Sequence, residues 1–318
     1  MDSKADIINN LTPDLFEPAT FEDRNAEKIR RPSIKYWPDV WRRLKQNKLA
    51  MVGLTIIVLM IFMSIFGPLF NGYSYFEQDY SKINMHPNGV HWFGTDELGR
   101  DLFTRVWFGA RYSLIIGILA ATIDFIIGVL YGGISGISGK QIDAVMMRVA
   151  EVVYSIPYLL IVILISVAFS TQGAGTSLFV LILAMTLTDW VPMAILVRGQ
   201  VLQLKESEYT LAAESLGSSN GWILRKHIIP NTLGPILVNV TLTIPRAIFA
   251  EATLGFLGLG FQAPKSSLGT LANDGLAGLP VGNAYQIIIP AIFISLIMFA
   301  FNVLGDGLRD ALDPRLRK

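Results

Sequence analysis

The sequence contains no cysteine, only three histidines and few charged residues, which make up 16% of its 318 residues. Without cysteine the chain has no disulfide framework, no thiol nucleophile and no cysteine-based metal site. Its net charge of +1 gives no sign of nucleic-acid binding. Hydrophobic residues, by contrast, make up 52% of the chain, and together with the scarcity of charge this excludes an ordinary soluble domain.

Long apolar runs predict an all-α integral membrane protein. Six stretches approach the ~20 residues that a helix needs to cross a hydrocarbon core of ~30 Å. Backbone polar groups in lipid must be hydrogen-bonded within the segment, so each stretch is expected to be a helix. The predicted spans are Leu49–Phe70, Ser113–Ile134, Val152–Phe169, Leu178–Val197, Leu233–Leu257 and Ile287–Leu304.

The basic residues predict the orientation of these spans. If the N-terminus is cytoplasmic, 20 of the 26 Lys and Arg residues lie in cytoplasmic segments, 5 lie outside and one lies within a span. This asymmetry predicts a multi-pass protein of the bacterial inner membrane with both termini in the cytoplasm. The first 48 residues are polar and rich in charge, unlike a cleavable signal peptide.

The N-terminal arm divides into two parts. Residues 1–35 lack apolar periodicity and predict a flexible polar arm. Within 36–48, the residues Trp37, Val40, Trp41 and Leu44 recur at helical spacing among Arg and Lys. This pattern predicts an interfacial amphipathic helix on anionic membrane lipid, and a plain basic flank of the first span explains it equally well.

The segment 205–231, between the fourth and fifth spans, has the residue types needed to dock a short helix onto a soluble partner. In the run from Tyr209 to Gly217, two adjacent alanines allow close approach to the helix backbone. Gly217 is expected to end this helix because glycine adopts a left-handed cap without steric cost. Pro230 fixes the chain where it re-enters the membrane. The residues expected to carry the contact are Leu211, Ala212, Ala213, Glu214, Gly217, Ile229 and Pro230.

This segment resembles the EAA coupling loop of ABC importer permeases, which in that family seats in a groove of an ATPase subunit. One position departs from the family pattern. Leu211 stands where the family usually has glutamate, and Glu214 lies about one turn further on. The resemblance therefore implies a docking helix in which a polar contact to the ATPase is missing or moved.

The resemblance continues along most of the chain, from Lys48 to Arg317. It is specific to the C-type permease subunits of dipeptide and oligopeptide ABC importers. The matching segments are His91–Asp101 followed by Arg105, Gly109, Arg111 and Ser113; Asp143 with Met147-Arg148; Ser155-Ile156-Pro157; Glu251–Gly260; and Leu308–Arg315. The family implies a type I permease fold, with the first span and an outer loop over 49–111, a core over 112–308 and a cytoplasmic tail over 309–318.

The outer loop invites comparison with a phosphate-binding P-loop. Gly94 and Gly99 have the right spacing, but Arg100-Asp101 replaces the required Lys-Ser/Thr pair, and Asp96 would repel phosphate. In the resembling family this segment is structural. Its arginines and aspartates are expected to pair and fix how the loop packs on the spans, and contact with substrate is the alternative.

The Gly133-Ile134-Ser135-Gly136 run fits the short signature of intramembrane serine proteases. Such an enzyme needs a histidine within reach of the serine. The histidines, His86, His91 and His227, all lie in predicted loops. Gly128, Gly132 and Gly136 are better interpreted as small residues for close helix packing, and the histidines as loop residues rather than metal ligands.

Four ionisable residues fall within the predicted spans, where charge is costly. For Asp124 and Glu251 we favour structural roles. For Asp189 and Arg246, a place on a polar translocation path and interhelical pairing are equally supported. Pro157, Pro192, Pro245 and Pro290 each remove a helix hydrogen bond, which fits kinks, helix starts or packing.

The resemblance implies a permease subunit that is not itself an enzyme and binds no cofactor. In the family such a subunit pairs with a homologous permease, with two ATPase subunits that bind ATP and Mg, and with an external solute-binding protein that delivers peptides. ATP-driven movement of the docking helix would then switch the path between inward- and outward-facing states. Two other readings stay open at this stage: nickel or another small cargo, and a non-transport role as a protease or sensor scaffold.

Overall fold

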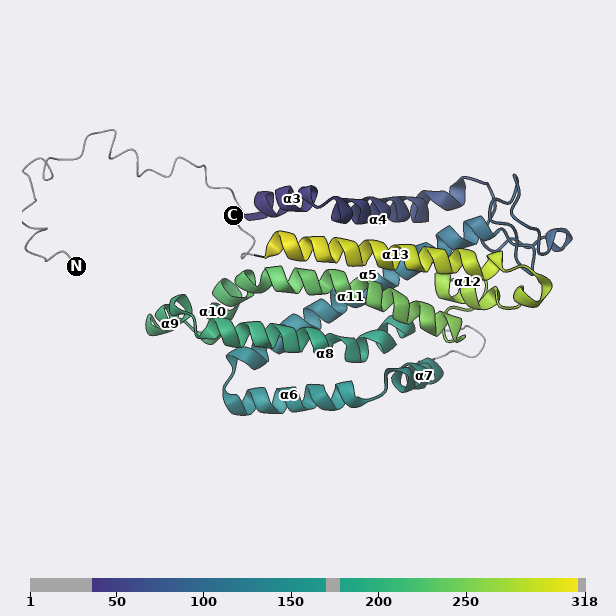
Figure 1. The fold of residues 1–318 in the computed structure, drawn as a ribbon. Helices are drawn as coiled ribbons and strands as arrows, with labels where there is room; N and C mark the ends of the chain where they lie inside the picture. Colours follow the sequence, from purple (N-terminus) through teal and green to yellow (C-terminus); the bar gives the residue numbers. More distant parts are fainter. Residues whose placement is uncertain (1–35, 170–177, 314–318) are drawn as a thin grey trace, which may run out of the picture. The chain divides into compact units, whose positions relative to one another are not determined.

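The computed structural model describes residues 36–169 and 178–313, and the chain folds there into α-helices joined by turns and short helical segments (Figure 1). The predicted arm over 1–35 and the end of the predicted tail, 314–318, lie outside the described residues. The helices are α3 (Tyr36–Gln46), α4 (Lys48–Phe66), α5 (Leu102–Ile137), α6 (Lys140–Ser155), α7 (Tyr158–Phe169), α8 (Leu178–Lys205), α9 (Glu208–Ser215), α10 (Asn220–Ile223), α11 (Ile229–Phe256), α12 (Leu268–Asp274) and α13 (Tyr285–Leu312).

Five of the described helical segments are long and apolar enough to cross a membrane. They are Lys48–Leu69, Leu102–Ile137, Leu178–Lys205, Asn220–Phe256 and Tyr285–Leu312. Helices α6 and α7 meet the same criterion as a pair and would form a sixth span, bent by 78° at the break between them. The predicted all-α integral membrane fold is confirmed.

The bent pair corrects the prediction of one continuous helix over Val152–Phe169. The break falls at Ile156-Pro157, where Ile156 has an extended backbone with ψ of 127°. Proline has no N–H to donate and disfavours helical geometry in the residue before it, so the helix stops there although the run stays apolar. In contrast, Pro192, Pro245 and Pro290 lie inside the continuous helices α8, α11 and α13.

Helix α5 begins at Leu102, well before Ser113, where the second span was predicted to start. Asp101 caps it, because its carboxylate accepts a hydrogen bond from the Thr104 backbone N–H at 2.8 Å. Residues 102–111, assigned to the outer-loop segment from the sequence, therefore form the first turns of α5. Two arginines in these turns lower the local hydropathy, which is why the sequence analysis started the span only at Ser113.

Helices α5 and α8 pack against each other in parallel through glycines of α5. A Cβ atom added at Gly128 would lie 2.5 Å from the Cβ of Met193, and one at Gly136 would lie 2.8 Å from the Cβ of Val201. Eight residues along α5 thus correspond to eight residues along α8. The interpretation of these glycines as small packing residues is confirmed.

The remaining long helices surround the first half of α5. A buried apolar cluster joins Val106 and Leu114 of α5 to Ile248 of α11, Leu271 of α12 and Phe301 of α13. Helix α4 packs on α13 so closely that a Cβ atom at Gly53 would lie 2.7 Å from the Ala300 carbonyl oxygen.

The predicted amphipathic helix exists as α3, and part of its apolar face contacts protein. Val40 and Leu44 are buried in a cluster with Ala50, Ala311 and Leu312. Trp41, which is 47% exposed, keeps the position expected of a residue at a membrane interface.

Candidate functional site

Helix α9, with the turn that ends it, forms the predicted docking segment. Gly217 has φ of +84°, the left-handed conformation expected from the sequence. Its N–H donates to the Glu214 carbonyl at 2.9 Å, and the Ser218 N–H donates to the Ala213 carbonyl at 3.1 Å. These two bonds form a Schellman cap, which ends the helix sharply and satisfies its last carbonyl groups.

Most of the predicted docking residues are exposed. Leu211, Ala212, Glu214, Gly217 and Pro230 all lie on the surface. Leu216, which the sequence analysis did not select, is 87% exposed. Large apolar side chains exposed this far, such as Leu211 and Leu216, indicate a surface that another molecule covers.

Ala213 and Ile229 instead face the protein. Both are partly buried and pack against a buried cluster that includes Ile137 of α5, Val201 of α8 and Ile228. Only Ala212 of the two alanines is therefore available for close approach by a partner, while Ala213 ties α9 to the ends of α5 and α8.

A continuous helical path connects this segment to α11. Ser219 caps α10 by accepting a hydrogen bond from the Trp222 N–H, and α10 runs into the π-helical segment η4 (Leu224–Ile228) and then into α11. Ile223 and Ile228 are almost fully buried along this path. The segment from α10 to α11 is thus a continuous helical connection, and it packs in the same cluster as Ala213 of α9.

At the opposite end of α5, Asp96 holds the connection between α4 and α5 together. One of its carboxylate oxygens accepts backbone hydrogen bonds from Leu98 and Arg100, both at 2.9 Å. The other accepts from the Arg100 guanidinium at 2.7 Å and from Arg105. Arg105 is 1% exposed and also donates to Asp274, the last residue of α12, at 3.1 Å.

This geometry matches the predicted pairing of arginines and aspartates in the loop. It also leaves no P-loop, because the backbone N–H groups of Leu98 and Arg100, which a phosphate would need, bind the Asp96 carboxylate. Gly99, with φ of +69°, packs directly on the Asp79 backbone, and Gly94 has φ of +77°. Side chains at either position would be strained.

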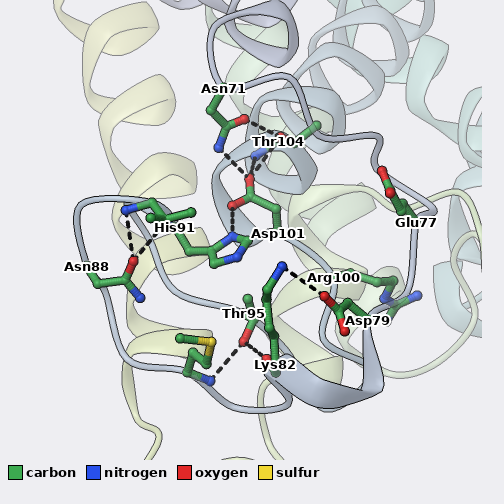
Figure 2. Close-up of polar contacts among 12 residues, drawn as sticks. Asn71, Glu77, Asp79, Lys82, Asn88, His91, Thr95, Arg100, Asp101 and Thr104 are labelled. Atoms are coloured by element: carbon green, nitrogen blue, oxygen red, sulfur yellow. Dashed lines mark hydrogen bonds and ion pairs between the residues drawn. The ribbon is translucent and has the colours of Figure 1, made fainter.

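A second polar group centres on Asp101 (Figure 2). Besides the Thr104 N–H, its carboxylate accepts hydrogen bonds from Asn71 at 3.0 Å and from the Thr104 hydroxyl at 2.8 Å, and it contacts His91 Nδ1 at 2.9 Å. The sequence analysis identified Asp101 but not its partners. The predicted loop role of His91 is supported by its burial against this carboxylate.

The same connection binds the start of α13. The Tyr285 hydroxyl donates to the Thr95 carbonyl at 2.9 Å, and Gln286 donates to the same oxygen. On the exposed side of the loop, hydrogen bonds from Lys82 and then from Ser81 lower the pKa of Asp79 to about 2. These contacts make the loop a rigid element rather than a mobile one.

The two ionisable residues considered for a translocation path, Asp189 of α8 and Arg246 of α11, line one cavity of about 260 Å³. Within the described part of the chain, no ion pair joins them. The cavity wall also contains Tyr154, Tyr158, Pro192, Met193, Asn239, Thr243, Ala247 and Ala250. The structure thus brings these two predicted residues together without pairing them.

Two further features bear on the alternative functions. The Ser135 hydroxyl donates to the Asp143 carboxylate at 2.5 Å, and none of its hydrogen bonds in the described residues is to a histidine. Among residues 36–169 and 178–313, no group of three or more metal-ligating side chains is placed to hold an ion.

Asp143 also forms an ion pair that the sequence analysis missed. Arg198 of α8 donates two hydrogen bonds, both of 2.5 Å, to the two carboxylate oxygens of Asp143 on α6. The fixed spacing of Asp143 and Met147-Arg148 was the only signal in the sequence, and it says nothing about a partner 55 residues away.

Comparison with known proteins places this architecture in a family. Residues 125–318 match the family model of the binding-protein-dependent transport system inner membrane component, and residues 35–87 match the N-terminal TM domain of oligopeptide transport permease C. The chain is 53% identical over 310 residues to the dipeptide transport system permease protein DppC of Bacillus subtilis (strain 168), covering 98% of this chain and 95% of the relative.

Two further matches agree in length and fold. The oligopeptide transport system permease protein OppC of the same organism is 50% identical over 311 residues, covering 98% of this chain and 100% of the relative. A chain of the MetNI methionine ABC transporter, solved in inward-facing conformations, has a TM-score of 0.52 at 21% identity and covers 67% of this chain and 96% of that one. The chain therefore belongs to the family of binding-protein-dependent transport system inner membrane components, as a multi-pass permease.

Proposed function

We propose that this protein is a permease subunit of an ATP-driven importer of dipeptides or oligopeptides. The observation that carries the proposal is the similarity over nearly the whole chain to permeases named for dipeptide and oligopeptide transport, at 53% and 50% identity. The family's motifs occur in this chain within intact structural elements, namely the Asp96 connection, the α9 segment and the α11–α12 region.

Helix α9 is the part that docks onto an ATPase subunit. Its exposed apolar residues, Tyr209, Leu211 and Leu216, favour burial against a partner, and its cap holds them in a fixed geometry. ATP is available in the cytoplasm, so α9, together with both chain termini, lies on the cytoplasmic side. The Asp96 connection then faces the solute-binding protein outside.

Energy from ATP reaches the transport path through α10, η4 and α11. Ile223 and Ile228 are buried against the ends of α5 and α8, so movement of α9 changes how α11 packs on them. ATP shifts the balance between inward- and outward-facing states if it is bound more tightly in one of them. The second wall of the path comes from a homologous permease subunit, because Arg246 lies exposed within a span and needs a polar neighbour there.

Uptake of labelled peptides of two to six residues tests this proposal. Cells lacking the gene and every other peptide importer are compared with the same cells carrying the wild-type copy. Uptake is expected to vanish without the gene and to return with it, and the dependence on length distinguishes dipeptide from oligopeptide transport. Equal uptake by both strains would contradict a peptide cargo.

A further inference from the structure

The cavity that contains Asp189 and Arg246 has opposite charges on two of its walls. Asp189 belongs to α8 and Arg246 to α11, and no ion pair joins them within the described residues. On α11, Asn239, Thr243 and Arg246 are spaced four and three residues apart, so they lie on one face of the helix, and all three line the cavity. A polar stripe on an apolar span marks a water-accessible path or a polar contact.

A second carboxylate lies behind Asp189. Helices α5 and α8 pack in parallel, with Gly128 against Met193 and Gly136 against Val201. One helical turn before the first of these contacts, the same register places Asp124 level with Asp189.

No hydrogen-bond partner in the described structure explains why the Asp124 carboxyl group is buried. It is 1% exposed, and neither carboxylate oxygen has a hydrogen-bond partner in the described structure. The buried hydroxyl of Tyr158, whose side chain lines the cavity, is unpartnered as well. Buried polar groups are rarely left without hydrogen-bond partners in native proteins. The unpartnered Tyr158 hydroxyl beside the cavity therefore points to a ligand there.

We propose that this cavity binds the two charged ends of a peptide during its passage, the α-ammonium at Asp189 and the α-carboxylate at Arg246. This inference rests on the proposed function and specifies how the permease contacts its cargo. Arg246 binds a carboxylate through a planar fork of donors that matches its geometry.

The size of the cavity fits a short peptide. A sphere of 260 Å³ is about 8 Å across, and an extended dipeptide spans roughly 7 Å. Both termini of such a peptide can therefore lie within one cavity. A tripeptide, roughly 10 Å long when extended, fits when it bends, and longer peptides would place one end there and the other toward the second permease subunit.

Peptides with one blocked end separate this site from a structural role. Labelled trialanine, N-acetyl-trialanine and trialanine amide are bound to the complete importer in nanodiscs without the solute-binding protein, so that protein's own preferences do not enter. Asp189→Asn is expected to weaken binding of trialanine and its amide about tenfold and to leave the N-acetyl peptide unchanged. Arg246→Gln is expected to weaken trialanine and the N-acetyl peptide and to leave the amide unchanged.

One more variant completes the test. Thr243→Val, which changes the same cavity wall without changing charge, is the matched control and is expected to affect all three peptides by one common factor. Recovery of the ATPase subunits with each variant shows that the complex has assembled.

The inference is overturned if Asp189→Asn or Arg246→Gln changes all three affinities equally or not at all, or if the wild-type complex binds no trialanine. Uptake of trialanine by the wild-type importer with its solute-binding protein is measured in parallel. Normal uptake alongside any of those results would reject this site while leaving peptide transport intact. Absence of uptake would reject the proposed function itself.

Discussion

The Arg198 guanidinium donates a hydrogen bond to each carboxylate oxygen of Asp143. This contact joins α8 to α6, the first helix of the bent pair α6 and α7. The Ser135 hydroxyl of α5 donates to the same carboxylate, so three helices meet at one side chain. Helix α6 contributes only one fully buried residue, Ala150, to the rest of the structure. This polar junction therefore holds α6 where apolar packing is sparse.

Removing the charge of Asp143 is expected to weaken this junction. In Asp143→Asn the Arg198 guanidinium loses its carboxylate partner, and hydrogen bonds to charged groups contribute about 1.5–3 kcal/mol. We expect a loss of about 2 kcal/mol in the free energy of unfolding, measured by SDS titration in mixed micelles. Arg198→Lys should cause a similar loss, because lysine cannot bind both oxygens.

The matched control for this prediction lies on the same helix. Arg148 and Glu151 form an ion pair whose side chains are 79% and 60% exposed. Exposed pairs contribute little, so Glu151→Gln should change the unfolding free energy by less than about 0.5 kcal/mol. An equal loss in Glu151→Gln and Asp143→Asn would show that burial and two-bonded geometry do not set the strength of the junction.

Asp96 is expected to be the most sensitive carboxylate of the connection before α5. It pairs with Arg100 and with the buried Arg105, and breaking a buried ion pair from one side costs about 3–5 kcal/mol. Asp274 remains as a partner for Arg105, so Asp96→Asn should lie near the lower bound, about 3 kcal/mol in the same titration. The exposed neighbour, Glu97→Gln, should be nearly neutral, and a comparable loss there would contradict the role of burial.

The fold was largely predictable because lipid imposes one rule on every apolar run: its backbone must bond to itself. That rule does not locate a break inside an apolar run, so Pro157 could be marked as a candidate kink or helix start, but the 78° bend was not predicted. Hydropathy also misplaced the start of α5, since Arg105 lowers the hydropathy of a turn whose charge is neutralised by Asp96 and Asp274. The Asp101 cap that marks the true start was not recognised in the sequence.

The candidate sites were predictable where the signal is local. Gly217 could be identified as a cap because a left-handed residue has few alternatives to glycine. Side chains that meet across helices, such as Asp143 with Arg198, could not be paired, because spacing along the chain does not determine register between helices. Which of Ala212 and Ala213 faces outward depends on the packing of α9 against α5 and α8, and only the structure supplies that.

The cap of α9 should matter for transport more than for stability. No atom lies within 4 Å of a Cβ atom added at Gly217, so a substitution there meets no steric clash within the chain. Gly217→Asp and Ala212→Phe, the second at the alanine that faces outward, are expected to abolish peptide uptake while the protein still inserts into the membrane. Uptake is measured in cells, and insertion by extraction and blotting of the membrane fraction.

A control at the same position distinguishes the cap from the contact surface. Asparagine tolerates the left-handed conformation better than other side chains, so Gly217→Asn preserves the cap while adding bulk. Aspartate also tolerates that conformation, so a loss of uptake confined to Gly217→Asp would show that charge on the contact surface abolishes transport, and an equal loss in both variants would show that bulk does. Normal uptake by a well-inserted Gly217→Asp protein would reject the docking assignment of α9.

The glycines between α5 and α8 provide the sharpest test of the packing. A Cβ atom at Gly132 would collide with the backbone of Ala194, which cannot move without displacing α8. Gly132→Ala is therefore expected to lower the free energy of unfolding by about 1–3 kcal/mol, as is typical of overpacked cores, and to lower the yield of assembled importer.

The adjacent Gly133 is the control, since a Cβ atom there would lie 3.5 Å from Leu224, an ordinary contact. Gly133→Ala should be neutral or stabilising, because alanine is favoured over glycine in helices by about 1 kcal/mol. If the two alanine variants behaved alike in SDS titration, the parallel contact of α5 with α8, and with it the level placement of Asp124 and Asp189, would be untenable.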